Sequence, residues 1–252
     1  MQIGQKIHHV LEINSTMEAC KRLANLGEPN GTIVSANYQE SGRGRFKRKW
    51  VSPSGDNIQM SVLLRPNQQE LKYLNIFASM AVLATCEQTL GVDGSIKWPN
   101  DVQINGKKIA GILVETVLEG EKVVSCVIGI GLNVNLDVKP HAEIEETATS
   151  LKCEKGRYIS RSVILKELIK QLDFYYSQIS DGRSLTQRWC DKLSTIGKKV
   201  TLSFGKNPKN HILVGLAESI SDDGGLIIRK EDGSLFTANA GEVTLARKEE
   251  IL

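Results

Sequence analysis

Two long apolar runs joined by a tight turn constrain the fold of this chain most. Residues 107–117 and 122–134 are rich in valine and isoleucine, and Glu119-Gly120 lies between them. Shorter strand-like runs at 95–98 and 102–104 precede Asn105-Gly106, a dipeptide typical of two-residue hairpin turns. The sequence therefore predicts successive antiparallel hairpins in the middle of the chain.

Helical periodicity and end signals surround this central region. Apolar spacing predicts helices over residues 16–26, 71–90, 160–179 and 184–193, and buried strands over 32–36 and 58–64. Ser15 and Glu18 have the spacing of a capping box, while Gly27 and Gly91 fit the position after a helix end. Residues 140–156 are polar and acidic, which predicts a flexible connection.

The character of the sequence changes near residue 195. Residues 195–252 contain five short strand-like runs, turn signals at Asp223-Gly224 and Asp232-Gly233, and no helical pattern. We therefore expect two domains, one over residues 1–194 and a small, barrel-like β domain over 195–252.

A glycine-rich basic segment, QESGRGRFKRKW at residues 39–50, contains Gly42 and Gly44 among five cations between 43 and 49. The segment 42–50 holds no carboxylate to neutralise them, which suits a polyphosphate ligand and favours a loop that is mobile when empty. The alternatives are a solvated basic loop or a patch for a nucleic-acid backbone. The net charge of the whole chain is +3, so the remainder is net negative, which lowers the nucleic-acid interpretation.

Three further features lie beside expected strands. KWPND, residues 97–101, predicts a sharp polar corner. Lys108 stands in an otherwise apolar run, where a lysine faces either water or a buried anion. Gly129 and Gly131 interrupt a strand, and we interpret them as places where a ligand comes close.

Cysteine usage and hydropathy bear on location. The five cysteines form no C-x-x-C pair, so neither a zinc site nor a disulfide framework is expected. No apolar run has the length of a signal peptide core or a membrane span. We expect a cytoplasmic protein with reduced thiols and no membrane partner.

Four motifs in this order, GRGRFKRKW, KWPND, GKKIAGILVE and GIGLNVN, resemble those of biotin protein ligases. The chain is similar to the members that lack an N-terminal winged-helix DNA-binding domain, and no nucleic-acid partner is implied. The resemblance implies an α+β fold, in which a mixed sheet flanked by helices, of the class II aminoacyl-tRNA-synthetase and biotin-synthetase type, is followed by an SH3-like β-barrel. It also implies ATP-dependent, Mg²⁺-assisted formation of biotinyl-5′-AMP, then biotin transfer to a lysine of the biotin carboxyl carrier domain of acetyl-CoA carboxylase or a related carboxylase, and a homodimer.

The resemblance assigns roles motif by motif. The implied biotin-binding residues are Ser15, Thr16, Met17, Gln39, Arg43, Gly44, Arg45, Lys108 and Gly111. The implied ATP-binding residues are Arg43, Arg45, Arg48, Trp50, Lys97, Asn100, Lys108 and Asn133. Lys108, Arg45 and Arg43 are the implied catalytic residues, and Asn100 and Asp101 the implied metal ligands. Met17 stands where many members have asparagine, and Phe46 where some have arginine.

Two other functions compete with this interpretation. A lipoate ligase shares a similar scaffold, but its usual R-R-x-[ST]-G-G-G loop is replaced here by SGRGR. A non-catalytic nucleic-acid-binding module would use the basic segment, yet Phe46 and Trp50 are the sole aromatic residues beside it.

Overall fold

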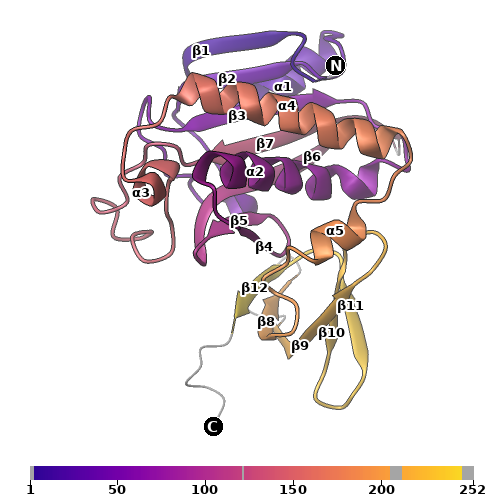
Figure 1. Cartoon of the computed structure of the whole chain (residues 1–252). Coiled ribbons are helices and arrows are strands. Elements are labelled where there is room, and N and C mark those ends of the chain that lie inside the picture. Colours follow the sequence, from indigo (N-terminus) through magenta and orange to yellow (C-terminus); the bar gives the residue numbers. More distant parts are fainter. Residues whose placement is uncertain (1–2, 121, 205–211, 246–252) are drawn as a thin grey trace.

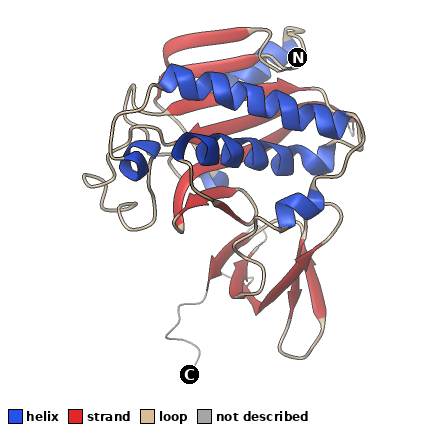
Figure 2. Ribbon diagram, viewed as in Figure 1, coloured by secondary structure: helices blue, strands red, loops and turns tan. Residues whose placement is uncertain are grey.

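The larger part of the molecule is built on a seven-stranded mixed sheet (Figures 1 and 2). The computed structural model describes residues 3–120, 122–204 and 212–245. The strands of this sheet are β1 (Ile7–Ile13), β2 (Ile33–Gln39), β3 (Ile58–Leu64), β4 (Ser95–Lys97), β5 (Asp101–Ile104), β6 (Lys107–Glu119) and β7 (Lys122–Leu132), in the order β1-β2-β3-β7-β6-β5-β4. β1 runs parallel to β2 and the other neighbours are antiparallel, which confirms the predicted mixed sheet.

The predicted hairpins are present at the predicted turns. Asn105 and Gly106 both have positive φ, of 49° and 75°, as a type I′ turn requires, and Gly120 has a φ of 61°. Strand β1, by contrast, was not predicted, because IHHVLEI lacks a regular alternation and its pairing partner lies 26 residues further along the chain.

The predicted helices are also found; three keep nearly their predicted length, and the one predicted over 184–193 is half as long. They are α1 (Thr16–Asn25), α2 (Leu74–Leu90), α4 (Arg161–Ser180) and the short α5 (Thr186–Cys190), and a 3-10 turn η2 (Leu71–Tyr73) leads into α2. Gly27 and Gly91 follow α1 and α2 with φ of 81° and 73°. The expected capping box is wrong: within the described structure Ser15 makes no side-chain cap, and Glu18 faces Lys21 and Arg43 instead.

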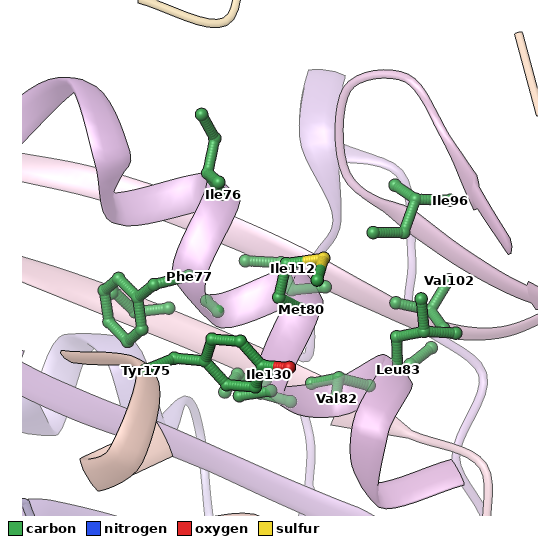
Figure 3. Packing of buried hydrophobic residues seen from close by; sticks show 14 of the residues in the cluster. Ile76, Phe77, Met80, Val82, Leu83, Ile96, Val102, Ile112, Ile130 and Tyr175 are labelled. Atoms are coloured by element: carbon green, nitrogen blue, oxygen red, sulfur yellow. The ribbon is translucent and has the colours of Figure 1, made fainter. Parts of the chain in front are cut away.

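Helices cover both faces of the sheet. α2 and α4 lie side by side on one face, and α1 packs against β2, β3 and β7 on the other (Figure 1). Alternate residues divide accordingly, so that Val62 belongs to the cluster under α2 and Leu63 to the cluster under α1. Figure 3 shows Phe77, Met80 and Leu83 of α2 packed over the sheet.

The expectation of a flexible connection over residues 140–156 is wrong. Lys108 of β6 donates its amide to Thr147 O (2.8 Å) and accepts from Thr149 N (2.9 Å). Ser150 then caps the short helix α3 (Leu151–Lys155) by accepting from Cys153 N. The side-chain composition of residues 140–156 could not reveal the pairing with Lys108, because its hydrogen bonds are made by backbone groups.

The chain beyond α5 forms a second, antiparallel sheet. Its strands in the described residues are β8 (Lys199–Ser203), β9 (Ile212–Ile220), β10 (Leu226–Arg229), β11 (Leu235–Ala238) and β12 (Glu242–Leu245), in the order β11-β10-β9-β8-β12. This matches the five predicted strands of a small, barrel-like β domain, although β11 and β12 do not pair with each other among the described residues. Val200 and Val243 belong to the same hydrophobic cluster as Trp98, whose indole Nε1 donates to Gly224 O (3.0 Å).

Candidate active site

A cavity of about 230 Å³ lies between the basic segment and the α1 face of the large sheet. Every residue that the sequence predicts for ligand or metal binding lines this cavity. These residues are Ser15, Thr16, Met17, Gln39, Arg43, Gly44, Arg45, Arg48, Trp50, Lys97, Asn100, Asp101, Lys108, Gly111 and Asn133. The structure thus brings together residues from the segments before β2, after β2, around β5 and along β6 and β7.

The basic segment folds over the cavity as a small hairpin, which we call the lid hairpin (residues 42–50). Trp50 N donates to Gly42 O (3.0 Å) and Gly44 N donates to Arg48 O (2.8 Å). Phe46 is at its tip, in the 3-10 turn η1 (Arg45–Lys47), with a positive φ of 56° that is uncommon for a bulky residue. The lid hairpin is therefore an ordered element with its own backbone hydrogen bonds.

Glycines in β6 and β7 form the floor beneath the lid hairpin. A Cβ at Gly131 would lie 2.5 Å from the Trp50 ring, and one at Gly129 would lie 2.7 Å from Met17 Sδ. The glycines do permit a close approach, as the sequence suggests, but the groups that approach are the side chains of Met17 and Trp50.

One end of the cavity carries neutral polar groups. Gln39 Oε1 accepts from Thr16 N (2.8 Å) and Thr16 Oγ1 (3.0 Å), while Gln39 Nε2 donates to Gln59 Oε1 (2.8 Å). Thr16 Oγ1 also lies 2.8 Å from Ser61 Oγ. The start of α1 and strand β3 thus hold Gln39 in a fixed orientation beside the buried Ser15.

The other end is charged. Lys108 Nζ lies 2.6 Å from Asp101 Oδ1 and 5.4 Å from the centre of the Trp50 ring, so this lysine does not simply point to water. Asn100 Nδ2 donates to Ile112 O (2.5 Å), and its Oδ1 accepts from Arg45 Nη1 (3.3 Å). Burial lowers the pKa of the Arg45 guanidinium, and Asp101 opposes that effect.

The sheet register sets the distance between the two ends. Gln59, Gly131, Gly111 and Asp101 lie opposite one another on four neighbouring strands. Three strand spacings amount to about 14 Å. An elongated ligand with a neutral polar head and an anionic tail would fit this row, and Lys108 Nζ would contact a Cβ placed at Gly111.

The expectation that no carboxylate neutralises the basic segment is wrong. Arg43 Nη2 donates to Glu18 Oε1 (2.6 Å) and to both oxygens of Glu115 (3.2 Å each). Arg48 donates to Glu242 of β12. These hydrogen bonds are the leading cause that lowers the pKa of Glu18 and of Glu242.

The partners of these arginines were missed because they are remote in sequence. Glu242 is 194 residues from Arg48, and a single glutamate in a short C-terminal strand carries no signal of its own. Ion pairing also removes the argument for a mobile loop that rested on repulsion among the cations.

Two buried polar atoms of the cavity lack a hydrogen-bond partner among the described residues. They are Trp50 Nε1, a donor, and Asn133 Oδ1, an acceptor. Asn133 Nδ2 is already used, because it donates to Thr149 O (3.0 Å). Buried groups of this kind are costly unless something pairs with them, so they suit a ligand with both a donor and an acceptor.

The two predicted metal ligands, Asn100 and Asp101, could offer a metal ion only oxygen atoms. In the described part of the chain, no group of three or more His, Cys, Asp or Glu side chains could hold a metal ion. Asn100 Oδ1 and the Asp101 carboxylate remain as oxygen donors at the charged end of the cavity. Mg²⁺ bound by one or two protein oxygens, with phosphate oxygens and water as its other ligands, is compatible with such a pair.

Among the described residues, no helix has the length and apolar character needed to cross a membrane.

Comparisons with known proteins give one family. Residues 11–133 match the model of the biotin/lipoate A/B protein ligase family, and residues 195–245 match the model of the biotin protein ligase C-terminal domain. The chain is 34% identical over 238 residues to the bifunctional ligase/repressor BirA of Bacillus spizizenii, covering 92% of this chain and 71% of that protein. It is 30% identical to the biotin–[acetyl-CoA-carboxylase] ligase of Mycobacterium tuberculosis, covering 90% and 83%.

The fold agrees with solved structures as well. The biotin protein ligase of Aquifex aeolicus in complex with biotin and ATP superimposes with a TM-score of 0.81 at 29% identity, covering 97% of this chain and 100% of that one.

Proposed function

This chain belongs to the biotin protein ligase family, and on that premise we propose that it joins biotin to a lysine of a carboxylase in two ATP-dependent steps. The observation that carries the proposal is the row from Gln59 to Asp101. It spans four strands, about 14 Å, from the neutral polar groups around Gln39 to the Lys108–Asp101 pair at the charged end of the same cavity.

In the first step, a carboxylate oxygen of biotin attacks the α-phosphorus of ATP, forming biotinyl-5′-AMP and releasing pyrophosphate. Lys108 would hold the carboxylate and the α-phosphate oxygen together, because its ammonium lies over Gly111 on the side of the charged end that faces the neutral end. Asp101 keeps that ammonium in place at 2.6 Å. Arg45, buried beside Asn100, would offset charge that develops on the phosphates.

The neutral end would recognise the ureido head of biotin. Thr16 and Gln39 are oriented by each other and by Gln59 and Ser61, so their free lone pairs and hydrogens point in fixed directions. Ser15, Met17, Gly44 and Gly111 would complete the walls. A buried ureido group left unpaired would cost affinity, and this arrangement prevents that.

The nucleotide would lie towards Trp50 and Asn133, which both line the cavity and carry an unpartnered donor and an unpartnered acceptor. Lys97 and Arg48 would lie beside the β- and γ-phosphates. The guanidinium of Arg43 donates to Glu18 and Glu115 and not towards the proposed phosphate site. Its contacts therefore favour a structural role over a direct catalytic one. Mg²⁺, held by Asn100 and Asp101, would supply neutralising charge to the phosphates.

In the second step, the amine of the acceptor lysine attacks the biotinyl carbonyl and AMP leaves. The acceptor would be the biotinyl domain of acetyl-CoA carboxylase or a related carboxylase, in the cytoplasm. Burial raises the pKa of Cys20 to about 12, so this thiol would not compete with that lysine as a nucleophile.

A homodimer is part of the proposal. β1 is an edge strand of the large sheet, and Ile7 and Leu11 on it are 45% and 75% exposed. An edge strand with exposed apolar residues can pair with another chain. Sedimentation of the protein with and without biotin and ATP tests this; a monomer under both conditions would contradict it.

ATP–pyrophosphate exchange by the purified protein tests the proposed reaction. We expect exchange with biotin and none with lipoate or without either acid. Exchange with lipoate alone would reassign the substrate within the same family, and absence of exchange with both would refute the proposed activity.

A further inference from the structure

Four charged side chains form a closed cluster at one edge of the lid hairpin. Besides its hydrogen bond from Arg43, Glu18 accepts from Lys21 Nζ (3.2 Å), and Glu115 Oε2 lies 2.7 Å from the same ammonium. Two carboxylates and two cations are thus connected in a ring. The side chains are between 27% and 41% exposed, so the cluster is neither buried nor fully solvated.

The cluster joins three elements that are far apart in sequence. Glu18 and Lys21 are on α1, Arg43 is on the lid hairpin, and Glu115 is on β6. Among these links, Arg43 is the one that reaches the lid hairpin. Through its single nitrogen Nη2 it connects that hairpin to both a helix and a strand of the sheet.

The position of the cluster places it at the rim of the cavity. Glu18 follows Met17, whose side chain packs over Gly129, and Glu115 is two residues from Leu113 on the same face of β6. Met17 and Leu113 both line the cavity. Glu18 and Glu115 do not line the cavity themselves. They are therefore placed to anchor its rim and not to contact a ligand.

The backbone of the lid hairpin carries this restraint to its other strand. Arg43 pairs with Lys49 in an antiparallel bridge, and Trp50 N bonds to Gly42 O. Fixing Arg43 therefore also fixes Trp50 on Gly131. Releasing Arg43 would free the first residues of the hairpin and loosen the packing of the indole.

We propose that Glu18 and Glu115 are positioning residues that clamp the lid hairpin shut through Arg43 and so retain the activated acyl-adenylate in the cavity. This rests on the proposed function for the identity of the retained species. A closed lid limits loss of a reactive intermediate to water, and an ion-pair clamp can open without unfolding the hairpin.

The experiment compares Glu18→Gln, Glu115→Gln and the double variant with the parent and with Glu119→Gln. Glu119 is an exposed residue of the same strand and serves as the matched control. The first readout needs no ligand: acrylamide quenching of Trp50, obtained as the difference between each protein and its Trp50→Phe counterpart. Trp98 and Trp189 are buried, and their indole nitrogens are bonded to Gly224 O and Ser79 Oγ.

The second readout is the rate at which biotinyl-5′-AMP leaves the loaded protein at low and high salt. We expect each single variant to release it two- to fivefold faster and the double variant more, because partly exposed ion pairs contribute modestly. Release from the parent should speed up with salt, whereas release from the double variant should not. Quenching of Trp50 should rise about twofold in the double variant.

Unchanged quenching and unchanged release in the double variant, with its urea midpoint preserved, would overturn the proposal. Arg43→Gln should reproduce the double variant, so loss of folding in one variant leaves the other to decide. If the parent shows no pyrophosphate exchange, the proposed function fails, while the quenching result still tests the clamp.

Discussion

The guanidinium of Arg48 donates two hydrogen bonds, of 2.5 and 2.6 Å, to the carboxylate of Glu242. Arg48 belongs to the lid hairpin over the large sheet and Glu242 to β12 of the second sheet. Lys97 and Arg45 are close enough to help lower the pKa of Glu242. An acidic side chain of the C-terminal sheet is therefore held among the cations that we assign to the phosphates.

This pair gives a pH dependence with a definite sign. Because folding lowers the pKa of Glu242 below its ordinary value of about 4.5, the pair stabilises the fold at higher pH and is lost as the pH falls through the lowered value. We expect Glu242→Gln to lower the free energy of unfolding at pH 7 by up to about 1 kcal/mol. The effect is small because the Arg48 side chain is 66% exposed. Urea titrations from pH 7 to pH 3 should show the two proteins converging in acid. A constant difference at every pH would contradict the assignment.

Lys108→Ala should lower the rate of adenylation by roughly two orders of magnitude or more, as the loss of other preorganised oxyanion donors does. The substitution also leaves Asp101 without its partner at 2.6 Å. Pyrophosphate release with saturating biotin and ATP is the measurement, and biotin binding followed by the fluorescence of Trp50 checks that the cavity is intact. Near-normal pyrophosphate release would refute the role of Lys108.

Gly131→Ala should displace Trp50, because the new Cβ would lie 2.5 Å from the rigid indole. We expect the KM for ATP to rise at least tenfold, since Trp50 is assigned to the nucleotide. Gly129→Ala is the matched comparison: its Cβ would meet Met17 Sδ at 2.7 Å, and a thioether can rotate away. Equal effects of both substitutions on the KM for ATP would mean that Trp50 does not hold the nucleotide.

The five thiols should divide by reactivity. Burial raises the pKa of Cys20 to about 12 and of Cys126 to about 11, and it also raises the pKa of the buried Cys86. Cys153 is exposed and Cys190 half-buried with a raised pKa. With an aromatic disulfide reagent at pH 8, Cys153 should react first, Cys190 slowly, and the other three after denaturation. Rapid reaction of more than two thiols in the folded protein would show that the core opens.

Short sequence signals correctly predicted the turns and the helix ends, because the residues at those positions determine the local backbone conformation. Asn105-Gly106 has the positive φ angles that its turn requires, and Gly27 and Gly91 follow their helices. The predicted capping box is not formed, because the Glu18 carboxylate accepts a hydrogen bond from Arg43, which lies 25 residues further along the chain. The pairing of residues 147–149 with Lys108 uses backbone groups, which no side-chain pattern reveals.

In the candidate site, too, some residues were predicted from the sequence and others were not. Sequence motifs selected residues that all line one cavity: most come from the start of α1, the glycine-rich segment and the KWPND corner, and the two long strands add Lys108, Gly111 and Asn133. The acids that hold Arg43 and Arg48 were not predicted, since Glu18, Glu115 and Glu242 come from three separate elements. Their positions follow from the packing of α1, β6 and β12 around the lid hairpin.

The shared hydrophobic cluster of the two sheets has a consequence for how this protein melts. Val200, Leu202 and Val243 pack into the same core as Ile96 and Trp98, and the Trp98 indole is bonded to Gly224 O as well. If either sheet comes apart, the other loses apolar contacts that nothing replaces. Calorimetry should therefore record a single endotherm whose van't Hoff and calorimetric enthalpies agree, and a fragment ended at residue 194 should be prone to aggregate.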